Sequence, residues 1–200
     1  MALRIVFMGT PEFAAVQLRA LWEQKEALDL SVVGAVCQPD KPRGRGKQLL
    51  PCAVKAYAQS VGIPVFQPQT LRDEAFAALL RECDPELIVV AAYGKLLPES
   101  VLQYPRLGCI NVHGSLLPHY RGAAPIQWAV LNGEKVTGVT SMYLAEGMDE
   151  GDIIDTLETE IGENETSGQL FDRLKVLGAE LLSRTVAQIE NGTAKRTPQD

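Results

Sequence analysis

The chain has few of the features that mark metal proteins, secreted proteins and membrane proteins. It contains two histidines and four cysteines, and no two cysteines have the CxxC spacing of common zinc and redox sites. No apolar run approaches the ~20 residues that a membrane span requires, and the N-terminus has too short an apolar stretch for a signal peptide. We therefore expect a cytoplasmic protein that binds neither metal nor membrane and has free thiols.

The chain also lacks an excess of positive charge. Its formal net charge of −6 argues against a general nucleic-acid coat or a membrane-surface binder. Four basic residues are nevertheless concentrated in one short stretch, where Pro42, Gly44 and Gly46 separate Lys41, Arg43, Arg45 and Lys47. Such a stretch is either a compact phosphate-binding patch or an exposed loop that charge keeps soluble.

The composition indicates one ordinary globular domain. Hydrophobic residues make up 46% of the 200 residues and charged residues 22%, and a chain of this length buries roughly 70% of its unfolded surface. We expect the domain to span residues 1–192, because Gly192 is suited to end the last helix. Residues 193–200 then form a polar tail.

Short apolar runs alternate with helical patterns along the chain. Residues 3–8, 30–36, 87–92 and 109–113 have the β-branched, apolar character of buried parallel strands. Residues 136–144 and 153–160 indicate a later pair of strands, and Thr166 with Gln169 indicates the capped start of a last helix. This order predicts an α/β fold with a doubly wound, mostly parallel, Rossmann-like sheet and a mixed edge.

The first strand-to-helix turn, Gly9–Phe13, argues against a dinucleotide cofactor. A dinucleotide fingerprint needs three glycines in the pattern GxGxxG, and Pro11 stands where the second glycine belongs. The close approach of a pyrophosphate is thereby blocked, so we expect no NAD.

Two polar residues lie at the end of the predicted strand 109–113. Because side chains alternate along a strand, Asn111 and His113 project on the same side. Ligand sites of open α/β sheets lie at the carboxyl ends of the strands, so this amide and imidazole could stabilise an oxyanion; alternatively, both cap backbone groups. Asp149 lies in the tight Gly147–Gly151 region, which could direct its carboxylate into the same site once the chain folds.

Seven segments spread along the chain form a recognisable set of motifs. They are Gly9–Ala14, Gln38–Asp40, Arg43–Lys47, Ala92–Gly94, Asn111–Pro118, Tyr120–Gln127 and Met148–Asp152. Together they resemble the methionyl-tRNA formyltransferase family, in the N-terminal catalytic domain shared by 10-formyltetrahydrofolate-dependent formyltransferases. The block from Asn111 to Pro118 followed by a later Asp is typical of these formyltransferases in general. The basic stretch and the residues from Gly122 to Gln127 resemble the tRNA enzyme.

The resemblance implies roles for these residues in translation initiation. It assigns catalysis to Asn111, His113 and Asp149. The donor, 10-formyltetrahydrofolate, would be contacted by Ser115, Leu116, Leu117 and Pro118, and initiator methionyl-tRNA by Lys41, Arg43, Arg45 and Lys47. The formyl group would pass to the α-amine of the methionine through an oxyanion that Asn111 and His113 stabilise with the help of Asp149. No metal and no NAD are implied.

Other interpretations share parts of this pattern. A formyltransferase acting on a small amine, in sugar or purine chemistry, has no need of the basic stretch. A formyltetrahydrofolate hydrolase uses water as the acceptor, and an RNA-binding module without activity does not need the catalytic trio. The family also carries a β-barrel domain after the catalytic one, so we expect residues 193–200 to begin the linker to it. We expect a monomer, and a cis peptide bond at Leu117–Pro118, where the loop must turn sharply.

Overall fold

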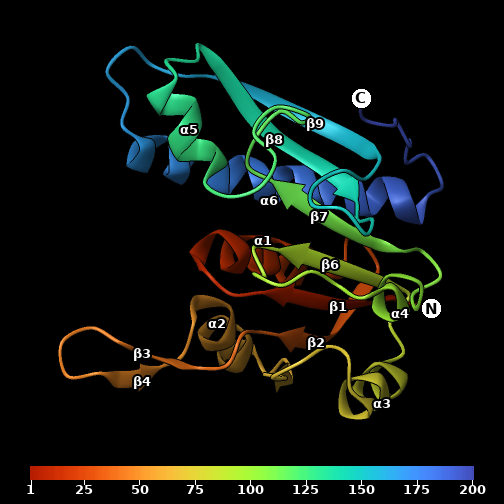
Figure 1. Cartoon of the computed structure of the whole chain (residues 1–200). Coiled ribbons are helices and arrows are strands. Elements are labelled where there is room, and N and C mark those ends of the chain that lie inside the picture. Colours follow the sequence, from red (N-terminus) through yellow and green to blue (C-terminus); the bar gives the residue numbers. More distant parts are fainter. The chain divides into compact units, whose positions relative to one another are not determined.

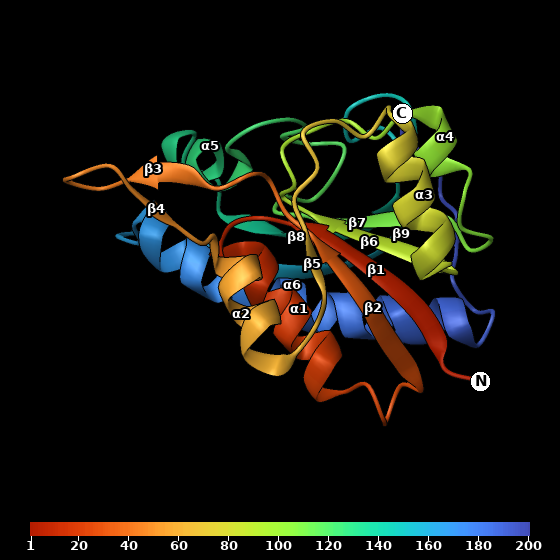
Figure 2. The same cartoon turned by 90° about the horizontal axis from the view of Figure 1, so that it is seen from below.

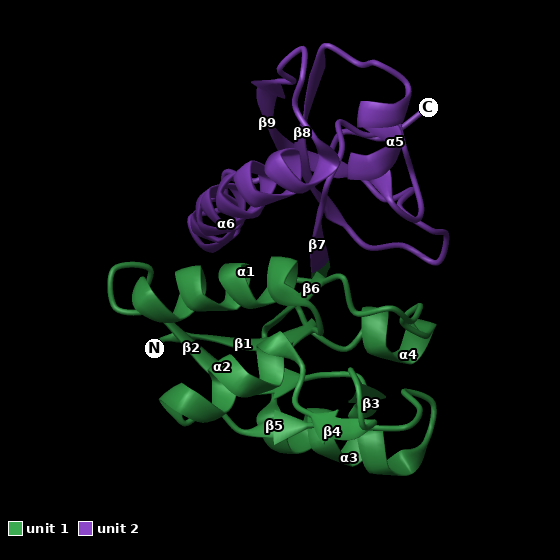
Figure 3. Ribbon diagram, turned by 90° about the vertical axis from the view of Figure 1, so that its left-hand side faces the viewer, with its two compact units in different colours: residues 1–109 green, residues 110–200 purple.

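A computed structural model describes residues 1–200, which form two compact units (Figure 3). Unit 1 comprises Met1–Cys109 and unit 2 comprises Ile110–Asp200. None of the helices combines the length and the apolar character needed to cross a membrane.

Unit 1 is built on a parallel sheet. Its strands are β1 (Leu3–Gly9), β2 (Leu30–Val36), β5 (Val65–Phe66) and β6 (Leu87–Ala91), in the spatial order β5-β2-β1-β6. β6 is buried along its whole length and β1 nearly so, as strands with both faces covered require. The three long strands confirm the sequence prediction for this half of the chain.

Helices connect the strands of unit 1. They are α1 (Glu12–Glu23), α2 (Ala53–Val61), α3 (Glu74–Cys83) and the short α4 (Glu99–Leu102). The turn from β1 to α1 needs a glycine for close packing, because a Cβ on Gly9 would lie 2.6 Å from the Ala91 carbonyl oxygen and 2.7 Å from the Ala14 Cβ. The absence of a side chain at Gly9 therefore lets β1 and α1 pack closely at this turn.

Asp73 is the N-cap of α3, and its carboxylate accepts from the Phe76 N–H at 2.9 Å.

The basic stretch of unit 1 is not the exposed loop that its proline and glycines indicated. It forms a hairpin instead, in which β3 (Lys41–Arg43) pairs antiparallel with β4 (Gln48–Leu50). Figures 1 and 2 both show this hairpin projecting beyond α2.

Unit 2 contains the antiparallel part of the fold. β7 (Cys109–His113) begins at the last residue of unit 1 and pairs with β8 (Val136–Tyr143), which pairs in turn with β9 (Ile153–Glu160). The helices are α5 (Pro125–Leu131) and α6 (Ser167–Glu190), and the apolar side of α6 packs on β8 and β9. Thr166 and Gln169 form the predicted capping box of α6. The late strand pair and the mixed character of the fold are thus confirmed.

Candidate active site

Asn111 and His113 lie on β7 beside β8. In the antiparallel register Asn111 is opposite Met142 and His113 is opposite Thr140. His113 is 8% exposed, whereas Asn111 is partly exposed and its amide makes no hydrogen bond with another protein group. The Asn111 N–H groups are therefore free to donate to a bound ligand.

The hydrogen bonding of His113 determines which ring nitrogen carries a proton. Its Nε2 lies 2.8 Å from the carbonyl oxygen of Tyr120, which can only accept, so Nε2 bears the proton. Its Nδ1 lies 3.6 Å from Oδ2 of Asp149. In the neutral ring Nδ1 is a base. In the protonated ring the Nδ1–H points toward the Asp149 carboxylate, which stabilises the positive charge.

Asp149 lies in the connection between β8 and β9 and is held by the loop after β7. Its Oδ2 accepts a hydrogen bond of 2.8 Å from the Gly122 N–H, and its side chain is 12% exposed. The backbone of Asp149 has φ +55°, a left-handed conformation that is uncommon for a residue with a side chain. The 3.6 Å between His113 Nδ1 and Asp149 Oδ2 confirms the prediction that the fold brings these two side chains within charge-pair range.

The loop Ser115–Pro118 is fixed to β8 by Thr140. The Thr140 hydroxyl donates to the Ser115 carbonyl oxygen at 2.7 Å and accepts from the Leu117 N–H at 3.1 Å. Ser115 and Leu117 are buried, Leu116 is partly exposed and Pro118 is exposed. The Leu117–Pro118 peptide bond is cis, as predicted. Given these exposures, Leu117 packs in the interior, whereas Leu116 and Pro118 have surface available to a ligand.

The basic hairpin presents its charges to solvent. All four residues predicted to contact phosphates, Lys41, Arg43, Arg45 and Lys47, are exposed. Asp40, at the base of the hairpin, connects it to the rest of unit 1. Its carboxylate accepts from Lys55 Nζ at 2.6 Å and from Gln67 Nε2 at 2.8 Å. The hydrogen bond from Lys55, then that from Gln67, hold the pKa of Asp40 below its usual range.

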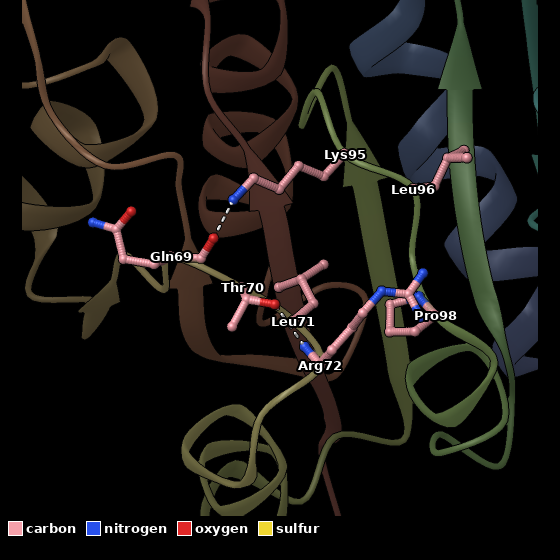
Figure 4. A pocket seen from close by; sticks show the side chains of 7 residues that line it. All are labelled: Gln69, Thr70, Leu71, Arg72, Lys95, Leu96 and Pro98. Atoms are coloured by element: carbon pink, nitrogen blue, oxygen red, sulfur yellow. Dashed lines mark hydrogen bonds between the residues drawn. The ribbon is translucent and has the colours of Figure 1, made fainter.

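Unit 1 also has a cavity of about 410 Å³ that the sequence patterns did not indicate. Figure 4 shows Lys95 reaching from one wall to the main chain of the other, where its Nζ donates to the Gln69 carbonyl oxygen at 2.7 Å. Arg72 adds a second positive charge, and Leu71 and Leu96 add apolar surface. Two positive charges and two leucines therefore line this open pocket. The lining residues are Gln69, Thr70, Leu71, Arg72, Lys95, Leu96 and Pro98.

Sequence reasoning missed three groups around the catalytic candidates. The Tyr120 carbonyl and the Gly122 N–H act through the backbone, so residue type gave no direct signal, although both lie in the segment that carries the family resemblance. Gln199 was counted as part of a polar tail. Its side-chain amide in fact donates to the carbonyl oxygens of Asp149 and Gly151.

Fold and sequence together define the class of the protein. The sequence pattern described as formyl transferase matches residues 3–186, and the chain belongs to this family. The resemblance extends to a named relative, the methionyl-tRNA formyltransferase of Acetivibrio thermocellus, which is 51% identical over 197 residues. That match covers 98% of this chain but 62% of the relative, so the chain spans less than two thirds of that protein's length.

Solved structures confirm the α/β formyltransferase fold. Phosphoribosylglycinamide formyltransferase from Bacillus halodurans superposes with a TM-score of 0.77 and 25% sequence identity, covering 93% of this chain and 94% of that one. The N-formyltransferase from Helicobacter canadensis, solved with folinic acid and dTDP-3-aminofucose, has a TM-score of 0.69 and 19% identity and covers 100% of this chain and 68% of that one.

Proposed function

We propose that this chain transfers a formyl group from 10-formyltetrahydrofolate to the α-amine of initiator methionyl-tRNA. The observation that carries the proposal is the grouping of Asn111, His113 and Asp149 in a chain half identical to a methionyl-tRNA formyltransferase. The Asn111 amide and the His113 imidazole can both donate to an oxyanion, and the Asp149 carboxylate is a charged partner for His113. An uncatalysed acyl transfer lacks all three groups.

The reaction forms one bond and breaks another at the formyl carbon. The neutral amine attacks this carbon, and the carbonyl oxygen becomes negatively charged in a tetrahedral intermediate. The intermediate collapses when the bond to N10 of the folate breaks. The amine loses one proton and N10 gains one, so the net change is a proton moved between the two nitrogens.

The chain's own groups suit these steps. Asn111 has free N–H groups that can donate to the oxyanion. In protonated His113 the Nε2–H is occupied by Tyr120, so Nδ1–H is the donor left for the reaction. The 3.6 Å between Nδ1 and Asp149 Oδ2 is longer than a good hydrogen bond. The oxyanion or a bridging water can therefore share this proton, while the Asp149 carboxylate faces the same ring nitrogen.

The binding residues support the proposed substrates. Leu116 and Pro118 offer partly apolar surface to the folate beside buried Ser115 and Leu117. The exposed cations of the hairpin, Lys41, Arg43, Arg45 and Lys47, suit the phosphates of tRNA in a chain that is otherwise acidic.

Acceptor competition tests the proposal. The purified chain is incubated with donor labelled in the formyl group, and label is followed into methionyl-tRNA, into a small amine, and into free formate. We expect transfer to methionyl-tRNA and its loss in Asn111→Ala. Transfer to the small amine alone would indicate a small-molecule formyltransferase, formate alone a hydrolase, and tRNA binding without turnover a binding module. Each of these three outcomes overturns the proposal.

A further inference from the structure

The segment after α6 is part of the support of the catalytic turn. Ile153 and Thr197 form an antiparallel bridge, with hydrogen bonds of 2.8 Å from the Ile153 N–H and 2.9 Å from the Thr197 N–H. Ile153 begins β9 and follows the turn that carries Asp149. This pairing therefore places the chain beyond Thr197 next to that turn.

The side chain of Gln199 uses both ends of its amide there. Nε2 donates to the carbonyl oxygens of Asp149 at 3.0 Å and Gly151 at 2.7 Å. Oε1 accepts from Arg121, at 3.1 Å from Nε and 2.8 Å from Nη2. Because a primary amide has two N–H donors and two acceptor lone pairs, its hydrogen-bonding capacity is fully used.

These contacts join the two segments that orient the Asp149 carboxylate. One segment is the turn itself, whose backbone carbonyls Gln199 holds. The other is the loop after β7, where Gly122 donates to Asp149 Oδ2 at 2.8 Å and its neighbour Arg121 binds Gln199. Removing the Gln199 amide therefore removes a support from both segments at once.

The turn needs such support because its conformation is unfavourable in isolation. Asp149 has φ +55°, and residues with side chains keep a left-handed backbone only where their surroundings impose it. Gly151 is buried, and a Cβ there would collide with the Tyr143 carbonyl oxygen. The carbonyl oxygens of Asp149 and Gly151, on either side of Glu150, both accept from the Gln199 amide nitrogen.

We propose that Gln199 is a positioning residue, which holds the Asp149 turn in the geometry that presents the carboxylate to His113. The inference rests on the proposed function only for its catalytic consequence. The structural part, that Gln199 restrains residues 147–151, stands independently of the substrate.

Two substitutions separate this role from simple attachment of the tail. Gln199→Ala removes all the side-chain hydrogen bonds. Gln199→Glu keeps the acceptor for Arg121 and adds charge attraction to it, but it removes the donors and sets a carboxylate against two carbonyl oxygens. Gln59→Ala, at an exposed glutamine on α2 of unit 1, is the matched control.

The measurements are kcat and KM for formyl transfer, and amide hydrogen exchange of residues 147–151. We expect both Gln199 variants to lose about 10- to 100-fold in kcat, the scale of a catalytic group misplaced by about 1 Å. We expect little change in the KM for the formyl donor, and faster exchange in the turn. Gln59→Ala should match the wild type in every measurement.

The contrary outcomes are distinct. Wild-type kcat and exchange in Gln199→Glu would mean that Gln199 only attaches the tail to Arg121, and would overturn the inference. Unchanged exchange with reduced kcat would overturn it as well, since the turn would not depend on Gln199. If Gln199→Ala fails to fold, the isosteric Gln199→Glu still decides. A wild-type chain inactive toward methionyl-tRNA would refute the proposed function, and the exchange comparison would still decide whether Gln199 restrains the turn.

Discussion

The replacement Asp149→Asn isolates the charge of the proposed catalytic carboxylate. One oxygen, Oδ2, both accepts from the Gly122 N–H at 2.8 Å and faces His113 Nδ1 at 3.6 Å. An amide oxygen in the same place keeps the acceptor for Gly122. Asn also tolerates the left-handed backbone that this position requires. The variant therefore changes the charge opposite His113 and little else.

The size of the effect follows from the distance. Two unit charges 3.6 Å apart attract each other by about 1 kcal/mol in water and by about 4–5 kcal/mol at an effective dielectric constant of 20. Both side chains are nearly buried, at 9% and 12% exposed, so the value lies toward the upper part of this range. Since about 1.4 kcal/mol is a factor of ten in rate, we expect kcat to fall by about 10²- to 10³-fold.

The assay is single-turnover formylation of methionyl-tRNA, with the affinity for the formyl donor measured separately. Asp29→Asn is the control, because Asp29 is exposed and also has a left-handed backbone, with φ +47°. Asp149→Ala, which removes the acceptor for Gly122 as well, should lose at least as much activity. A turnover within twofold of wild type in Asp149→Asn would refute the charge argument and leave Asp149 as a structural acceptor for Gly122.

Three further outcomes are expected from the same structure. Arg43→Ala with Arg45→Ala should weaken methionyl-tRNA use and flatten its dependence on salt concentration, because fewer counterions are released; identical salt curves for variant and wild type would make the hairpin a solubilising surface. The pKa of Glu86 is lowered, first by the hydrogen bond from the Arg4 backbone N–H. The contribution of Glu86 to stability is therefore present at neutral pH, and it is lost as the pH falls below the ordinary glutamate pKa of 4.5 and through the lowered pKa of the folded state. Glu86→Gln should therefore lower the free energy of unfolding at pH 7 and reduce its fall in acid, as measured by denaturant titrations across pH; parallel pH profiles would contradict this. Gly9→Ala should destabilise the chain by about 1–3 kcal/mol through overpacking, and an unchanged thermal midpoint would show that the turn can relax.

The sequence was sufficient to predict the elements whose residues carry a strong periodic or apolar signal. Residues 87–92 form an uninterrupted apolar run, and the structure buries the corresponding strand Leu87–Ala91 throughout. Thr166 and Gln169 carry a capping signal that depends only on local chemistry, and both reciprocal hydrogen bonds are present. Such signals are strong because they do not depend on distant parts of the chain.

The basic hairpin shows where this reasoning ends. Its strands Lys41–Arg43 and Gln48–Leu50 have three residues each, and every residue in them is exposed. An exposed strand needs no alternation of apolar and polar residues, so periodicity gave no signal, while Pro42, Gly44 and Gly46 indicated a loop. Gly44 and Gly46 do have positive φ, at +71° and +96°, but in the tip that joins the two strands.

The arrangement around His113 was beyond sequence reasoning for a different reason. The acceptor for its Nε2–H is the backbone carbonyl of Tyr120, a group that every residue possesses, so no residue pattern identifies it. Both residues that face the ring, Tyr120 and Asp149, have left-handed backbones, at φ +58° and +55°. Glycine would adopt either conformation more readily, but it would also let the carbonyl or the turn move. Both residues are supported by distant side chains: the Tyr120 hydroxyl donates to Glu134 at 2.6 Å, and the Asp149 carbonyl oxygen accepts from Gln199 at 3.0 Å. The side chains to which we assign the chemistry were therefore visible in the sequence, whereas the groups that contact and support them were not.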